Sequence, residues 1–273
     1  MKHIFLNLKR FDIKKELGGV NDISCSGGWG EKILSEISQG VKEFDDLDFA
    51  VFVPEGHLLS ASKASDGVAV GCQGVFRRDV EQGKNFGAFT TLLTAKAATG
   101  LGATYAIIGH CEERNNLREI IELGGGKNFD VINEILNQEI KSAIASGLKV
   151  LYCVGERTEE QETRFDVLTK QINIGLNGVD SKNVVVAYEP VWAIGPGKPV
   201  PTAEYIDGVA RCIKKSASVD VIYGGGLKLE NAEMMAQIES IDGGLIALTT
   251  FGADFGFSVE NYLKIVKKYN ESL

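Results

Sequence analysis

Short apolar segments recur along this chain of 273 residues, and segments with helical periodicity separate them. The eight apolar segments run almost without polar interruption, as strands do when both faces of a parallel sheet are covered. They span residues 3–8, 48–53, 68–72, 104–108, 149–153, 184–189, 219–223 and 244–247. Strands that alternate with helices indicate the α/β class, because a parallel strand pair needs a long crossover between its members.

The periodic segments predict helices over residues 31–44, 87–99, 129–146, 159–176, 202–215 and 229–238, with a last helix over 259–269. Eight strand–helix units in about 250 residues fit a closed (β/α)8 barrel better than an open sheet. No linker or change of composition interrupts the series, so residues 1–273 are expected to form a single domain.

The composition excludes several classes of protein. A formal net charge of −8 argues against nucleic acid as a main partner, because phosphate backbones attract clustered lysine and arginine. No apolar stretch reaches the length of a membrane span, so no membrane partner is expected. The five cysteines (Cys25, Cys72, Cys111, Cys153 and Cys212) are dispersed and odd in number. That pattern favours a reducing cytoplasm and predicts neither a disulfide framework nor a zinc site.

One segment combines a carboxylate with a loop that could cover it. A run of three valines leads to Glu189, and Pro190 ends the strand because proline has no N–H for the next ladder bond. Trp192, Gly195 and Gly197 follow in the loop. A carboxylate in this position suits proton abstraction beneath a lid, although a surface turn with an incidental glutamate is the alternative interpretation.

Other polar residues also follow predicted strands. Asn7 and Lys9 end the first strand, His110 follows the fourth, and Glu189 ends the sixth. In a (β/α)8 barrel the carboxyl ends of the strands share one face, where the chemistry is found. We therefore expect these four residues to meet in one active site, and their spacing suggests no ligand set for a metal.

The residues around these positions resemble those of the triosephosphate isomerase family over nearly the whole chain. The matching motifs are Asn7-Leu8-Lys9, Gly87-Ala88-Phe89-Thr90, Tyr105 to Glu112, Cys153-Val154-Gly155-Glu156, Ala187 to Lys198 and Tyr223-Gly224-Gly225. The resemblance implies a TIM barrel and an aldose–ketose isomerase that interconverts dihydroxyacetone phosphate and glyceraldehyde 3-phosphate without metal or organic cofactor. Glu189 would be the base and His110 a neutral acid, while Lys9 would stabilise the enediolate and Asn7 would orient the substrate.

The same resemblance places a lid over residues 190–198 and a phosphate site in three backbone segments. Gly195, Gly226, Ala247 and Leu248 would present their N–H groups to the phosphate. Here the sequence departs from the family: Pro196 removes one N–H, Gly226 replaces a serine, and Leu248 replaces a glycine. Phe251 and Phe255 lie in a longer final loop that could reshape the pocket.

Further departures concern the loop from Gln73 to Thr90 and the segment after His110. In the family this loop inserts into a second subunit, which implies a homodimer with Thr90 near the partner's base. The loop is several residues longer than the family pattern. Cys111 stands where serine is usual and is interpreted as structural, and Glu113 replaces the first of two arginines, of which Arg114 retains the second.

The altered phosphate segments leave three hypotheses. The first is triosephosphate isomerase activity. The second is isomerisation of another short sugar phosphate, for example a tetrulose phosphate. The third is a relative without catalysis that binds a metabolite, and the retained set Asn7, Lys9, His110 and Glu189 argues against it.

Overall fold

The eight strands close into one barrel in which every strand pairs in parallel with the next. In this computed structural model, which describes residues 1–21, 23, 28–195, 197–251 and 255–273, the strands are β1 (Lys2–Asn7), β2 (Leu47–Val53), β3 (Ala69–Cys72), β4 (Tyr105–Ile108), β5 (Lys149–Val154), β6 (Val184–Tyr188), β7 (Asp220–Tyr223) and β8 (Gly243–Ile246). The first strand also pairs with the last, with His3 opposite Gly243. The predicted α/β class and barrel are confirmed.

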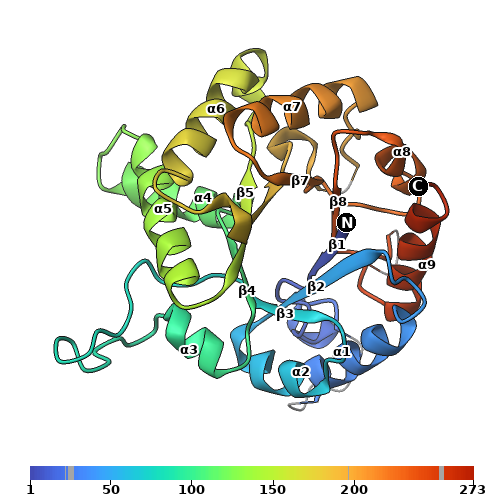
Figure 1. Ribbon diagram of the computed structural model, residues 1–273, viewed down its shortest axis with the longest axis horizontal. Coiled ribbons are helices and arrows are strands. Elements are labelled where there is room, and N and C mark those ends of the chain that lie inside the picture. The colour runs from blue at the N-terminus through green and yellow to red at the C-terminus, as the bar shows by residue number, and fades with distance from the viewer. Residues whose placement is uncertain (22, 24–27, 196, 252–254) are drawn as a thin grey trace.

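Helices surround the barrel on its outer side (Figure 1). In the described residues they are α1 (Trp29–Gly40), α2 (Leu58–Ala64), α3 (Ala95–Gly100), α4 (Cys111–Leu123), α5 (Asp130–Ala145), α6 (Arg164–Gly175), α7 (Ala203–Ser216), α8 (Ala232–Gln237) and α9 (Val259–Asn270). Their apolar faces pack on the outward side chains of the strands and form the larger part of the core. This arrangement explains why the strands are apolar on both faces.

The inside of the barrel is filled by side chains and is not a channel. Phe5, Phe52 and Tyr105 contact one another edge to face, with ring centroids 5.5 to 6.2 Å apart. Smaller residues such as Ala50, Ala187 and Leu245 complete this inner cluster. The packed interior makes the barrel a rigid support for the loops at its carboxyl face.

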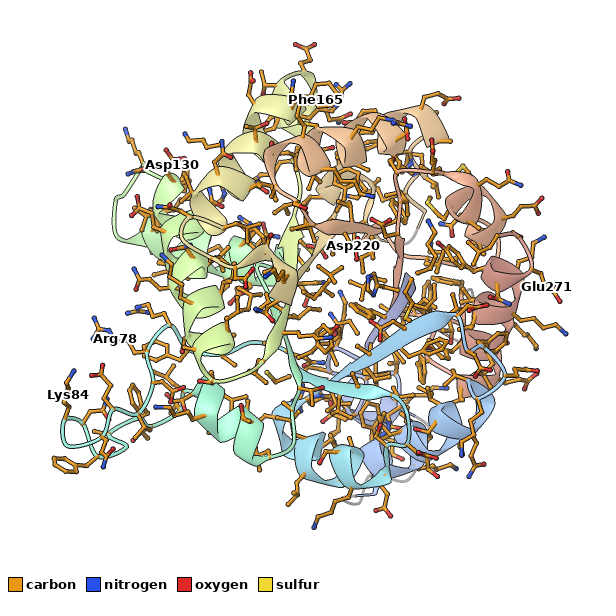
Figure 2. All side chains as sticks on the ribbon, viewed as in Figure 1. Arg78, Lys84, Asp130, Phe165, Asp220 and Glu271 are labelled. Atoms are coloured by element: carbon orange, nitrogen blue, oxygen red, sulfur yellow. The ribbon has the colours of Figure 1, made fainter. Side chains whose placement is uncertain are left out.

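The helix predicted over residues 87–99 is wrong in its first half. Helix α3 begins only at Ala95, where the Thr94 side chain accepts a hydrogen bond from Ala97 N. Residues 73–94 instead form a long loop that projects from the barrel, with Arg78 and Lys84 on it (Figure 2). Phe76 N donates to Leu93 O at 2.8 Å, and Lys96 N donates to Asp79 Oδ2 at 2.8 Å. These bonds hold the base of the loop.

Two helices, α2 and α4, were not predicted. Helix α4 is mostly polar, and Cys111 is its one buried residue. Because so little of it faces the core, it lacks the apolar periodicity from which a helix is predicted. Among the described residues, no helix is both long and apolar enough to cross a bilayer.

Candidate active site

A cavity of about 220 Å³ lies at the carboxyl ends of the strands. All eight residues predicted for the site line it: Asn7, Lys9, His110, Glu189, Gly195, Gly226, Ala247 and Leu248. Phe251, predicted to reshape the pocket, is also in the lining. So are Phe11 and Lys228, which the sequence analysis did not single out. The structure therefore brings together residues that are far apart along the chain.

Glu189 is fixed by close packing of the backbone around it. Its N–H donates to Val154 O at 2.7 Å, which extends the β5–β6 pairing by one residue. A Cβ on Gly155 would lie 1.7 Å from Glu189 O, and one on Gly224 would lie 2.8 Å from Glu189 Cγ. Both neighbours must therefore be glycine for this carboxylate to occupy its place.

The carboxylate of Glu189 is removed from water and faces two groups of the fourth loop. Its side chain is 2% exposed. Oε2 accepts a hydrogen bond from Cys111 N at 2.8 Å, and Oε1 lies 3.2 Å from His110 Nε2. Burial raises the pKa of Glu189 above the ordinary value, and His110 and the Cys111 amide offset only part of that effect. A raised pKa makes the ionised carboxylate a stronger base.

The imidazole of His110 is held in one tautomer by the helix that follows it. His110 is the N-cap of α4, and its Nδ1 accepts a hydrogen bond from Glu112 N at 3.3 Å. A ring nitrogen that accepts carries no proton, so the neutral ring bears its proton on Nε2. Nε2 is the nitrogen that faces Glu189, so an N–H donor and a carboxylate lie side by side in the cavity.

Lys9 occupies an unusual backbone conformation beside the cavity. Its φ is +40°, in the left-handed region that side chains other than glycine seldom adopt. Asn7 Oδ1 accepts from Lys9 N at 3.0 Å, and Gln73 Nε2 donates to Lys9 O at 2.8 Å. These two bonds hold the strained residue in place. Its Nζ donates to Glu112 Oε1 at 2.6 Å.

The start of the loop at residues 190–198 is anchored by one buried carboxylate, Glu156. Its Oε1 accepts from Trp192 Nε1 at 2.6 Å and from the hydroxyls of Tyr188 and Tyr205 at 2.9 Å each. The rings of Trp192 and Tyr205 also meet edge to face, with centroids 5.6 Å apart. The motif that ends in Glu156 was visible in the sequence, but its function as an anchor was not. Pro196, predicted to remove an N–H here, lies outside the described residues.

At the far end of the cavity, the turns after β7 and β8 face each other. Gly226 has a φ of +95°, which explains why glycine suits this position. Leu248, which replaces a glycine of the family, contributes to the cavity wall. Thr250 and Gly256 then pair as an antiparallel bridge, with Phe251 and Phe255 between them in the sequence. These two rings meet edge to face, with centroids 6.1 Å apart.

A second pair of carboxyl groups lies behind His110. Glu113 Oε2 accepts from Gly109 N at 2.5 Å, and the carboxyl group of Glu139 on α5 lies close to that of Glu113. Burial, followed by the proximity of Glu113, raises the pKa of Glu139 to about 9, and burial also raises the pKa of Glu113. Arg114 lies next to this pair and donates to Gly109 O at 2.8 Å and to the Tyr152 hydroxyl at 3.0 Å.

Two residues of the cavity wall and the neighbouring Cys111 are also close enough to share a cation. One potential ligand atom from each of His110, Cys111 and Glu189 lies within 4.8 Å of the others. The spacing in the sequence did not suggest this cluster. Burial raises the pKa of Cys111 to about 12, which keeps it a thiol at neutral pH. A neutral thiol is a poor metal ligand, so the cluster suits proton transfer better than metal binding.

The fold and the cavity together define a class, the (β/α)8-barrel enzymes whose chemistry lies at the carboxyl face of the strands. The sequence model of the triosephosphate isomerase family matches residues 28–268. The chain belongs to the triosephosphate isomerase family.

Individual relatives agree with this assignment. The triosephosphate isomerase of Mycoplasmopsis pulmonis is 33% identical, over 80% of this chain and 92% of the relative. That of Dictyoglomus thermophilum is 33% identical, over 79% of this chain and 86% of the relative. The crystal structure of triosephosphate isomerase from Bartonella henselae superposes with a TM-score of 0.73 at 24% identity and covers 98% of both chains. That structural likeness shows the same fold.

Proposed function

We propose that this protein interconverts dihydroxyacetone phosphate and glyceraldehyde 3-phosphate through an enediolate. The observation that carries this proposal is the pair formed by Glu189 and His110, with Oε1 3.2 Å from Nε2 inside a cavity that Lys9 also lines. A base next to an N–H donor is what transfer of a proton between adjacent carbons requires.

The proposed reaction divides proton transfer and charge stabilisation among three residues, Glu189, His110 and Lys9. Glu189 takes a proton from the carbon beside the substrate carbonyl, while His110 Nε2–H polarises the carbonyl oxygen. Negative charge then collects on the two oxygens of the enediolate, where the Lys9 ammonium stabilises it. His110 moves a proton between these oxygens, and Glu189 returns its proton to the neighbouring carbon. Because the substrate and the product are isomers, the reaction needs no external oxidant or reductant. No step uses a metal or an organic cofactor.

The phosphate of the substrate belongs at the opposite end of the cavity. We place it against the backbone N–H groups of Gly195, Gly226, Ala247 and Leu248, all of which line this space. Asn7 supports the other end, because its side chain bonds the Lys9 backbone. Residues 190–198 close over the substrate and exclude water, and Glu156 holds the start of this lid.

The test is a coupled steady-state assay of the purified protein on glyceraldehyde 3-phosphate, with tetrulose phosphates in parallel. A kcat/KM near the diffusional ceiling, about 10⁸ M⁻¹s⁻¹ or somewhat below, is expected on the triose. Absence of turnover on every sugar phosphate would overturn the proposal and favour a metabolite-binding relative.

A second candidate is isomerisation of another short sugar phosphate, such as a tetrulose phosphate. It is favoured by two bulky side chains, Leu248 and Phe251, in the cavity wall where the phosphate is placed. If they displace the phosphate, Leu248→Gly increases kcat/KM on the triose and decreases it on the tetrulose. Equal or lower triose activity in the variant, with high wild-type activity, would show that the pocket accommodates leucine.

We further propose that the protein acts as one domain and as a homodimer in the cytoplasm. The projecting loop 73–94 supports the dimer, because Phe86 on it is 84% exposed. A hollow of about 410 Å³ beside the base of the loop, lined in part by Arg10, Gln73 and Phe76, offers space for a partner's loop. The free thiols of Cys72, Cys111, Cys153 and Cys212 support a reducing compartment, and Cys25 lies outside the described residues.

A further inference from the structure

Lys228 lies at the phosphate end of the cavity, two residues after Gly226. It is half-buried and contributes to the cavity lining. A Cβ built on Gly226 would lie 3.7 Å from Lys228 Cε, so the aliphatic part of the lysine folds back over that glycine. Its Nζ lies 4.5 Å from the centroid of the Phe251 ring on the facing turn. The ammonium is thus placed between the two turns that follow β7 and β8.

The backbone that carries Lys228 is held in a fixed turn. The side chain of Asn231, which is 4% exposed, accepts from Lys228 N at 2.8 Å through Oδ1. Its Nδ2 donates to Gly226 O at 3.0 Å. One buried amide therefore ties the two ends of the Gly226–Lys228 turn together, and the lysine is directed toward the cavity by a rigid support.

No described carboxylate pairs with the ammonium of Lys228. Within the described part of the chain, its ammonium forms no ion pair, and its contact with Phe251 leaves the positive charge in place. Lys9, the other lysine in the cavity lining, already contacts Glu112 at 2.6 Å. A dianionic ligand that enters this cavity therefore finds at Lys228 an ammonium group that pairs with none of the described carboxylates.

The turns around Lys228 lack two groups that commonly bind a phosphate in such barrels. One is an extra short helix within the loop that directly follows strand seven or eight, whose N-terminus attracts an anion. Residues 224–231, and those described between β8 and α9, form no helix. The other is the serine hydroxyl that Gly226 has lost. A substrate phosphate here would depend on backbone N–H groups unless a side chain supplies positive charge.

We propose that Lys228 is a specificity-determining residue that binds the phosphate of the substrate and replaces the missing hydroxyl and helix end. On binding, the ammonium leaves the ring of Phe251 and forms a charge-assisted hydrogen bond with a phosphate oxygen. The exchange is favourable because such a bond is stronger than a solvent-exposed cation–π contact. This proposal rests on the proposed function, in that it assumes a phosphorylated substrate.

The experiment compares Lys228→Met, Lys228→Arg and a matched control, Lys215→Met. Lys215 is an exposed lysine at the end of α7, at the face of the barrel away from the cavity. Loss of a hydrogen bond between charged groups is expected to raise the KM for glyceraldehyde 3-phosphate about 10-fold or more in Lys228→Met. The kcat should change by less than about threefold, because the phosphate bond is the same in ground and transition states. Lys228→Arg should retain most of the affinity, and Lys215→Met should match the wild type.

Two readouts separate phosphate binding from a structural effect. Turnover of unphosphorylated glyceraldehyde at high concentration should be the same in Lys228→Met and the wild type. Calorimetric binding of glycerol 3-phosphate, which needs no catalysis, should weaken about 10-fold in Lys228→Met. Unchanged affinity for glycerol 3-phosphate, or an equal loss on glyceraldehyde, would overturn the role of Lys228. Binding that depends on Lys228 in a wild type without triose turnover would support this role and overturn the proposed isomerase activity.

Discussion

At the scale of single residues, the site depends on how little freedom Glu189 has. Gly155 and Gly224 leave no space for the backbone to move, and the Cys111 amide fixes one carboxylate oxygen. The other oxygen faces the ring of His110 at 3.2 Å. Close packing thus both raises the pKa of the Glu189 carboxylate and fixes the orientation of that group. Each effect gives a separate prediction.

The first prediction concerns pH. A base must be ionised to act, so kcat/KM should fall as the pH decreases through the pKa of Glu189 in the free enzyme. Because burial raises this pKa, the decline should begin clearly above pH 4.5, the ordinary value for a glutamate. A pH profile measures it, with circular dichroism at each pH to show that the fold persists. Full activity down to pH 4.5 would contradict the assignment of Glu189 as the base.

The second prediction concerns position. Glu189→Asp shortens the side chain by one methylene and withdraws the carboxylate from the substrate carbon. The kcat should fall about 100-fold or more, whereas KM should change little, because the base acts mainly in the transition state. Steady-state kinetics on glyceraldehyde 3-phosphate tests this expectation. A variant with unchanged kcat would exclude the proposed role of Glu189.

Residues that directly follow strands could be placed from the sequence, because the carboxyl ends of parallel strands share one face. Asn7, Lys9, His110 and Glu189 are of this kind, and the cavity contains all four. Phe11 and Lys228 could not be placed in this way. Their positions depend on the paths of turns, which are determined by tertiary contacts such as the bonds of Asn231 to Gly226 and Lys228.

At the scale of elements, helices α4 and α5 bring two carboxyl groups together, and neither group forms an ion pair with a described residue. Glu139 is 7% exposed and lies close to Glu113, which accepts a hydrogen bond from Gly109 N. Arg77 and Arg114 are the positive charges near the pair. A pKa of about 9 means that Glu139 retains its proton at neutral pH.

The third prediction follows from this pair. The folded state holds the Glu139 proton up to about pH 9, whereas the unfolded chain releases it near pH 4.5. Between these values the folded state binds more protons, so its free energy of unfolding should decrease as the pH rises, by up to about 1.4 kcal/mol per pH unit. Glu139→Gln should flatten this slope and raise the Tm at pH 8.

Thermal unfolding at pH 5 and pH 8 measures the effect, and Glu134→Gln is the control because Glu134 is exposed on the same helix. If the free energy of unfolding has the same pH dependence in the wild type and in Glu139→Gln, the folded protein does not retain the Glu139 proton.

The elements themselves were predictable where their periodicity is strong. The predicted strand ends differ from those of β1 to β8 by at most one residue. Helix α4 escaped prediction because its charged face dominates its sequence. The helix expected over residues 87–94 does not form. The left-handed backbone at Phe86, Gly87 and Thr91 marks this stretch as loop, and such conformations follow from contacts that the apolar pattern does not report.

At the scale of the whole molecule, the projecting loop 73–94 is a feature that a monomeric barrel does not require in order to fold. It extends beyond the helices that surround the barrel (Figures 1 and 2). Phe86 is 84% exposed on it, and large apolar side chains in such positions commonly mark interfaces. Gln73 connects this loop to the site, since it donates to the backbone of Lys9. A partner that orders the loop would also stabilise the strained lysine.

The fourth prediction tests this interface. Phe86→Asp should raise the dissociation constant of the homodimer about 10-fold or more, because it would place a charge in a desolvated contact. Activity should decrease in parallel at concentrations where the dimer dissociates. Light scattering after size exclusion measures the mass, and Phe165→Asp is the control, since Phe165 is exposed on α6 far from the loop (Figure 2). A monomeric wild type, or a variant as dimeric as the wild type, would contradict the proposed dimer.

The pairing of the first strand with the last has a consequence for how the chain acquires its activity. His110 and Glu189 follow β4 and β6, so they can meet once the middle of the chain has wound. Lys9 and Leu248 follow β1 and β8, whose pairing joins His3 to Gly243. Contacts between such distant segments carry the largest entropic cost and form late. A folding chain would therefore bring His110 and Glu189 together before Lys9 and Leu248 complete the cavity, and turnover would begin when that seam closes.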